Sequence, residues 1–135
     1  MLAPFVYWPD FDYTGTDRIG VGVDVFTMKP PAVDQADGAL PVRIAVDRAY
    51  GMLMRAEYLD AKGVVVRKLT LGDFAKVDDQ GMIKFCDLED EKTKDYDRFQ
   101  VKAVAMKLQL DAAIFDPKKL NQPAMVPPTA AWNPM

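Results

Sequence analysis

Carboxylates are the side chains of this 135-residue chain that could most readily do chemistry, because histidine is absent. Without histidine the protein lacks the usual general base and the commonest metal ligand. Residues 10–15, Asp-Phe-Asp-Tyr-Thr-Gly, resemble the start of a calcium loop, but Val21 stands where that loop needs a bidentate Glu. We therefore predict a solvated turn and no metal site here. An enzyme that uses Asp10, Asp12 or Asp24 is the weakest of the functional hypotheses.

The acidic run and the single cysteine each have a structural explanation. Four acids lie within residues 87–91, and lysines follow them, a pattern typical of a solvated hairpin tip. Cys86 cannot form an internal disulfide, and it alternates with the apolar Met82 and Leu88 as a core residue would. The glycine-rich phosphate loops and nucleophile motifs of common enzymes are missing. We predict a non-catalytic protein without a cofactor.

The composition is that of an ordinary globular protein. Half of the residues are hydrophobic, 27% are charged, and the formal net charge is −3. Because basic residues do not outnumber acidic ones, we predict that nucleic acid is not a partner. No run of about 18 apolar residues occurs, so the sequence predicts no transmembrane segment. The apolar N-terminus lacks a basic region and contains Pro4, so it does not resemble a signal peptide.

Methionine is unusually frequent, with eight residues in the chain. Its thioether side chain is flexible and polarisable, so methionines on strands can fill gaps in a core or form a pliable apolar surface. Core filling is the simpler explanation, and the second one predicts a face that binds an apolar ligand. The residues of this candidate ligand-binding face are Phe26, Met52, Met54, Tyr58, Met82, Met106 and Leu108.

An apolar period of two predicts β-strands along most of the chain. Residues 42–47 and 52–59 alternate in this way, and the second run places Met52 and Met54 on the face of Tyr58. Polar turns follow these and later runs, and we expect hairpins between successive strands. These turns lie at residues 60–63, 78–81 and 90–95, and we expect a glycine in the left-handed region, Gly63 and Gly81, to close the first two. The predicted fold is mostly β, a curved antiparallel meander sheet with little helix.

Breaks in the alternation predict the other segments. Residues 20–28 form a strand whose glycines indicate curvature, and residues 5–13 are extended. Residues 32–40 form a polar loop, and short helical turns are predicted at 71–76 and 117–120.

The end of the sheet and the C-terminus break the pattern further. The last strand, residues 97–110, changes phase, and a β-bulge near Ala103 explains this, with a strand covered on both faces as the alternative. Residues 121–135 contain four prolines and no charge. They predict an extended tail outside the sheet, beyond a β domain of residues 1–120. A tail that covers an apolar groove through Met125 and Trp132 is a second hypothesis.

Three stretches resemble the outer membrane lipoprotein-sorting family. Residues 58–81, YLDAKGVVVRKLTLGDFAKVDDQG, resemble the C-terminal half of that family, with its glycine turn, its strand and its Asp-Phe-x-Lys-Val-Asp segment. Residues 110–120 resemble the family's ending, and residues 4–13 resemble a stretch before a glycine-rich strand. The match covers about residues 4–120. It lacks the family's N-terminal strands and lid helices, and Met82 follows Gly81 where the family has an aromatic residue.

The resemblance implies a fold and a function. Members of the family resemble periplasmic carriers, in which an open antiparallel half-barrel holds acyl chains on its concave side. By resemblance, we expect non-catalytic binding of lipid or lipoprotein acyl chains in the bacterial cell envelope, in the periplasm. The alternative is a structural or interaction domain whose apolar sheet face is buried in a homodimer or against another chain.

Overall fold

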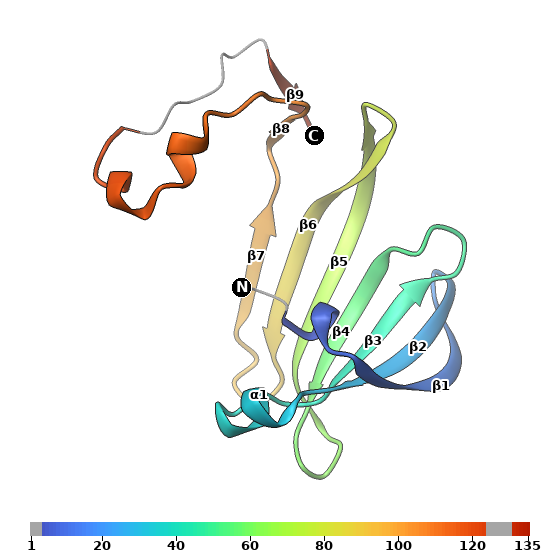
Figure 1. Cartoon of the computed structure of the whole chain (residues 1–135). Coiled ribbons are helices and arrows are strands. Elements are labelled where there is room, and N and C mark those ends of the chain that lie inside the picture. Colours follow the sequence, from blue (N-terminus) through green and yellow to red (C-terminus); the bar gives the residue numbers. More distant parts are fainter. Residues whose placement is uncertain (1–3, 124–130) are drawn as a thin grey trace. The chain divides into compact units, whose positions relative to one another are not determined.

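The chain forms an antiparallel meander of seven strands that does not close into a barrel (Figure 1). The computed structural model describes residues 4–123 and 131–135. The strand order in the sheet follows the order in the chain. The strands are β1 (Asp10–Ile19), β2 (Val21–Lys29), β3 (Val42–Asp47), β4 (Leu53–Leu59), β5 (Val65–Val77), β6 (Gln80–Asp90) and β7 (Tyr96–Gln100). The predicted fold class, a mostly β open meander, is confirmed.

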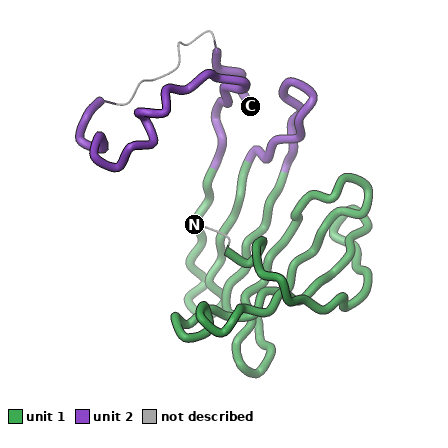
Figure 2. The backbone as a smooth tube through the Cα atoms, viewed as in Figure 1, with its two compact units in different colours: residues 1–72, 85–99 green, residues 73–84, 100–135 purple. Residues whose placement is uncertain are grey.

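The chain divides into two compact units (Figure 2). Unit 1 consists of residues 1–72 and 85–99, and unit 2 of residues 73–84 and 100–135. The short elements of unit 1 are the 3-10 turn η1 (Pro4–Tyr7) and the helix α1 (Ala32–Ala36). Those of unit 2 are β8 (Ala103–Ala105), η2 (Ala112–Phe115), η3 (Pro117–Lys119) and β9 (Trp132–Pro134). The predicted domain boundary after residue 120 stays a prediction.

Residues with positive φ make the turns of the central hairpins. Gly63 has a φ of +77°, as predicted, and its amide donates to the carbonyl of Asp60 in the β4–β5 turn. Between β5 and β6, φ is 49° at Asp78 and 65° at Asp79, so these two residues alone form the turn. The prediction that Gly81 closes this turn is wrong, because Gly81 already lies in β6.

The N-terminal hairpin differs from its prediction. Residues 10–15 were predicted as a solvated turn, but they belong to β1, which pairs with the whole of β2 around Gly20. Gly20 has a φ of +70°, a conformation that glycine adopts without strain. Residues 5–13 are therefore not one extended segment, since η1 ends at Tyr7 before β1 begins.

Local preferences also fail in two later segments. The polar loop predicted at 32–40 contains α1, and the helical turn predicted at 71–76 is part of β5. Residues 71–76 join β5 because pairing with neighbouring strands overrides the weak preference of a short helical segment. The helical turn predicted at 117–120 is confirmed by η3.

The last predicted strand is interrupted. β7 ends at Gln100, and β8 begins at Ala103 in a separate two-stranded sheet with β9. The phase change therefore marks the end of a strand, so the predicted bulge and the continuous strand are both wrong. Trp132 pairs with Ala105, and thus the end of the predicted tail does join a sheet. Met125, the other residue of the groove-covering hypothesis, lies outside the described residues.

Three bulges interrupt the regular pairing of strands β1 to β5. The register skips Thr14 between β1 and β2, Met54 between β3 and β4, and Val66 between β4 and β5. A bulge reverses the face on which the following side chains lie. The bulge at Met54 accordingly places Leu53 in the apolar cluster around Ala56. The predicted alternation of residues 52–59 fails at this point.

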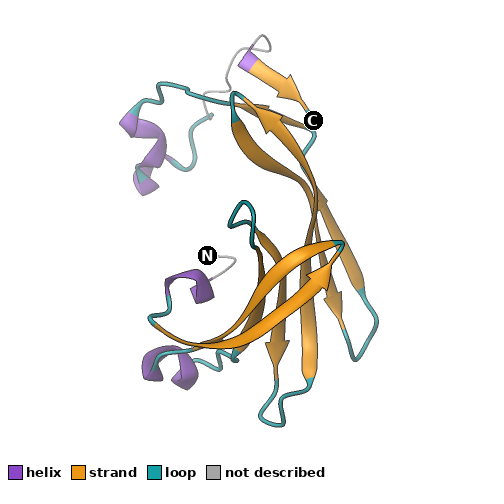
Figure 3. Ribbon diagram, turned by 90° about the vertical axis from the view of Figure 1, so that its right-hand side faces the viewer, coloured by secondary structure: helices purple, strands orange, loops and turns teal. Residues whose placement is uncertain are grey.

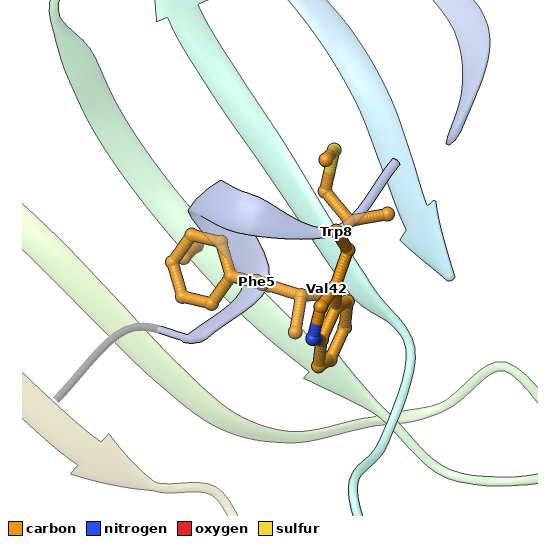
Figure 4. Close-up of a cluster of buried hydrophobic side chains, with 5 residues drawn as sticks. Phe5, Trp8 and Val42 are labelled. Atoms are coloured by element: carbon orange, nitrogen blue, oxygen red, sulfur yellow. The ribbon is translucent and has the colours of Figure 1, made fainter. Parts of the chain in front are cut away.

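The turn η1 packs on the apolar face of unit 1 (Figure 4). Phe5 is fully buried and Trp8 is 7% exposed, and both belong to one cluster with the fully buried Val42 and Ala56. The other members of the cluster and its margin are Met28, Phe26, Ala39, Ile44, Leu53, Tyr58 and Leu69. Because apolar burial is the main driving force of folding, the N-terminal turn is part of the core.

Substitution of Phe5 by alanine should therefore destabilise the protein. The change leaves a cavity between η1 and the sheet, and we expect the free energy of unfolding to fall by about 3–5 kcal/mol. Urea denaturation followed by circular dichroism measures this. Tyr7→Ala is the matched control, because Tyr7 lies in the same turn and is 74% exposed; its effect should stay within about 0.5 kcal/mol. Equal effects of the two substitutions would contradict the packing described above.

Candidate functional site

A cavity of about 560 Å³ lies in unit 1 between the N-terminal turn, the segment after α1 and strands β4 and β5. Figure 3 shows η1 and α1 on the same side of these strands. The apolar side chains around the cavity are those of Pro4, Phe5, Trp8, Ala39, Leu40, Tyr58 and Val66. Its polar side chains are those of Asp60, Arg67, Asp90 and Lys92. The cavity thus combines an apolar wall with charged residues, the composition of a small-molecule site.

An aromatic cluster and one hydrogen bond position the wall of the cavity. The Phe5 ring makes edge-to-face contacts with Trp8 and Tyr58, with ring centroids 6.5 and 6.1 Å apart. The indole Nε1 of Trp8 donates to Oδ2 of Asp34 in α1 over 2.7 Å. The indole ring therefore packs on the core while its polar edge ties η1 to α1.

The bulge in β5 brings two neighbouring residues to the cavity. The register pairs Tyr58 with Arg67 and Leu59 with Val65, and leaves Val66 between them. In a regular strand Val66 and Arg67 would lie on opposite faces, yet both line the cavity. Burial raises the pKa of the Tyr58 phenol, and the charge of the cross-strand Arg67 partly opposes this. The bulge thus places a cation beside an apolar wall.

Two acids at the cavity hold the adjoining loops. Oδ1 of Asp60 accepts from the amides of Lys62 and Val64 at 2.8 and 2.9 Å. Oδ1 of Asp90 accepts from the amides of Lys92 and Thr93 at 2.8 and 3.0 Å. These backbone hydrogen bonds lower the pKa of the Asp90 carboxyl, with smaller contributions from neighbouring cations. Both carboxylates therefore stabilise the turns that border the cavity.

The opposite face of the central strands carries paired charges. Nε of Arg43 lies 2.7 Å from Oε2 of Glu57, and Nε of Arg55 lies 3.4 Å from Oε1 of the same residue. A second hollow of about 480 Å³ includes both arginines, and its remaining lining is Thr14, Thr16, Asp17, Val25, Thr27 and Leu59. Polar groups of this kind would lose hydration against a hydrocarbon. The 560 Å³ cavity is the better candidate for an apolar ligand.

Of the predicted ligand-binding residues, Tyr58 lines the cavity and Phe26 lies close to it in the core. Phe26 packs against the buried cluster that contains Phe5. Its ring also contacts Phe11 and Tyr13 of β1, with centroids 5.9 and 5.4 Å away. Phe26 therefore links the core to the aromatic residues of the edge strand, and it is not part of the cavity lining.

The other predicted residues do not line this cavity. Met52 and Met54 are half-buried in unit 1, on either side of Leu53, next to the bulge between β3 and β4. Met82, Met106 and Leu108 belong to unit 2, where each is half-buried. A ligand face that includes these five residues stays a prediction.

Sequence reasoning missed most of the cavity lining. The apolar run 4–8 ahead of the first strand could have indicated Phe5 and Trp8, had it been considered as a cover for the sheet. Val66 and Arg67 could not be found together, because strict alternation separates them. Lys92 was assigned to a solvated hairpin tip, and the folded chain places that tip beside the cavity.

Two solved structures share this fold. One, described as an outer membrane lipoprotein-sorting protein domain from Vibrio parahaemolyticus, superimposes with a TM-score of 0.74 at 18% identity. The match covers 83% of this chain and 48% of that one. The other, a DUF1329 family protein from Desulfovibrio piger, gives a TM-score of 0.64 at 18% identity and covers 82% of this chain and 46% of that one.

These similarities concern the fold. The resemblance to lipoprotein-sorting proteins that the sequence indicated is confirmed at this level, and the chain spans about half the length of the two matched structures. Neither a protein-family profile nor a curated protein matches the sequence. Among the residues that the structure describes, no helix has the length and apolar character needed to cross a membrane.

Removal of the Asp34 carboxylate should loosen η1. In Asp34→Ala the buried indole N–H of Trp8 loses its acceptor, which costs about 1–3 kcal/mol. We expect the fluorescence of Trp8 to shift to longer wavelength as the indole becomes hydrated. The measurement uses a Trp132→Phe background, since the chain has two tryptophans.

Asp37→Ala in the same background is the matched control, because Asp37 is exposed at the C-terminal end of α1. Its emission should equal that of the parent. Unchanged emission in Asp34→Ala would mean that the hydrogen bond does not hold the turn.

Proposed function

We propose that this chain binds the acyl chain of a lipid or lipoprotein in the bacterial cell envelope, without catalysing a reaction. The observation that carries the proposal is the 560 Å³ cavity with its apolar wall, whose accessible side chains include Leu40, Tyr58 and Val66. Sites for small ligands have volumes of roughly 300–1,000 Å³ and predominantly apolar linings.

Hydrophobic burial would supply the affinity. Each methylene group removed from water contributes about 0.8 kcal/mol, so a short length of acyl chain against the aromatic wall gives useful binding. Packed side chains back the wall, because Phe5 and Trp8 are buried in the core and Trp8 donates to Asp34. A preformed wall loses little conformational entropy when a ligand binds.

The fold supports the same proposal. The matched Vibrio parahaemolyticus structure is described as a lipoprotein-sorting domain, and we propose that this chain likewise acts in lipoprotein sorting or transport, at the outer membrane and in the periplasm. This chain spans about half of that protein. The part of a bound acyl chain that the cavity does not cover would therefore contact other polypeptide or solvent.

Val66→Glu should weaken this binding. The substitution replaces an apolar contact by a carboxylate, which would lose hydration against the hydrocarbon of a ligand, so affinity should fall at least about tenfold, or 1.4 kcal/mol. The purified protein is titrated with a fluorescent fatty acid and with a lipidated peptide at concentrations near 10 µM, roughly −7 kcal/mol.

Val64→Glu is the matched control, since Val64 lies two residues earlier, is 56% exposed and does not line the cavity. It should bind like the parent, and circular dichroism should show that both variants are folded. The proposal fails if the parent binds neither ligand, or if a folded Val66→Glu protein binds as well as the parent.

One observation favours the alternative, an interaction domain that pairs with a second copy. All five residues of β7, at the edge of the sheet, are exposed, among them Tyr96 and Phe99. An unpaired edge strand with aromatic side chains can pair with another chain.

If this alternative holds, sedimentation velocity should show a dimer that Phe99→Lys converts to a monomer. Phe115→Lys should leave the dimer intact, because Phe115 is equally exposed but lies in η2, outside the sheet. A monomer at every concentration would exclude the alternative.

A further inference from the structure

Two cations of the cavity have no partner among the described residues. Arg67 and Lys92 line the cavity, and both are exposed. Neither forms a salt bridge within 4.0 Å or a side-chain hydrogen bond with another residue in the described ranges 4–123 and 131–135. By contrast, Lys68 on the other face of β5 is paired with Glu89 and Glu91. The donors of Arg67 and Lys92 are therefore free to bind a ligand.

The acids of the cavity form no ion pairs with these two cations. Asp60 and Asp90 each direct one carboxylate oxygen to two backbone amides of their own turns. Both acids line the same cavity as the cations. The charge of Arg67 contributes to the lowered pKa of Asp90, although the two side chains form no ion pair. An incoming anion would thus meet guanidinium and ammonium donors that the fold has not used.

The cations stand directly beside the apolar wall. Arg67 is the cross-strand partner of Tyr58, whose ring contacts the buried Phe5. Val66, the bulged neighbour of Arg67, is part of the apolar wall. A ligand that reaches from Arg67 into the cavity therefore passes from a charged group to hydrocarbon and aromatic surface within one residue of β5. Such a gradient complements an amphiphile.

We propose that the cavity takes an amphiphile with an anionic head group. Arg67 and Lys92 bind the carboxylate or phosphate oxygens of the head group, and the hydrocarbon lies against Leu40, Tyr58 and Val66, the accessible part of the apolar wall. This inference rests on the proposed function and adds to it a preference of the cavity for ligands with an anionic head group. Arginine suits the role because its planar guanidinium binds a carboxylate or phosphate through two parallel hydrogen bonds.

Ligands with the same chain and different head groups test this inference. Dodecanoate, dodecanol and dodecyltrimethylammonium, all below their micellar concentrations, displace a fluorescent fatty acid from the full chain at pH 8. We expect dodecanoate to bind about tenfold more tightly than dodecanol, and the cationic ligand to bind most weakly. Added salt should reduce the preference for dodecanoate, because the head-group site is exposed.

Arg67→Gln and Lys92→Gln remove one charge each and keep hydrogen-bonding capacity. Each should weaken dodecanoate about fivefold, as expected for one partly exposed charge contact, and leave dodecanol unchanged. Lys62→Gln is the matched control, since Lys62 is exposed in the nearby β4–β5 turn but does not line the cavity. It should leave both affinities unchanged.

The outcomes separate this inference from the proposed function. If no dodecyl ligand binds, the proposed function fails, and the inference fails with it. If all three bind equally, or if Lys62→Gln weakens dodecanoate as much as Arg67→Gln does, acyl chain binding stands and the selection for charge is wrong. Displacement of dodecanoate by acetate at equal concentration would show a site for small anions and would also overturn the inference.

Discussion

Unit 1 depends on the burial of Phe5 and Trp8 against the fully buried Val42 and Ala56. An antiparallel sheet with one apolar face requires a cover on that face. Regular helix is scarce in the part of the chain that the structure describes, and α1 contributes no buried residue. The four-residue turn η1 and the Trp8 that follows it supply the cover instead. The cavity between η1, β4 and β5 is the space that this small cover leaves.

The two faces of the central strands have different roles. On one face, Glu57 binds Arg43 and Arg55, so charges satisfy one another. On the other face, apolar side chains meet the N-terminal turn, and Arg67 is left without an ion pair among the described residues. Glu57 is 8% exposed, so its carboxylate depends on these arginines, because a buried charge without a partner is costly. The unpaired cation is of more interest for function, because its donors remain available.

The candidate site shows where sequence reasoning succeeds and fails. Tyr58 was found because it lies in a regular part of β4, where alternation predicts the face of each residue. Val66 and Met54 violate alternation, since a bulge adds a residue to one strand and moves its neighbours to the other face. The bulge arises from the pairing of two strands, so neither strand alone reveals its position. Lys92 reaches the cavity for a similar reason, because only the folded sheet brings its hairpin tip there.

The sequence by itself determined the fold class and the order of the hairpins, because alternation and turn residues act over a few neighbouring positions. It also indicated the similarity to lipoprotein-sorting proteins that the solved structures bear out at the level of fold. Only the tertiary structure decided that residues 71–76 extend a strand, that η1 covers the sheet, and that Arg67 and Val66 face one cavity. These features depend on contacts between distant parts of the chain, whose burial and pairing outweigh local preference.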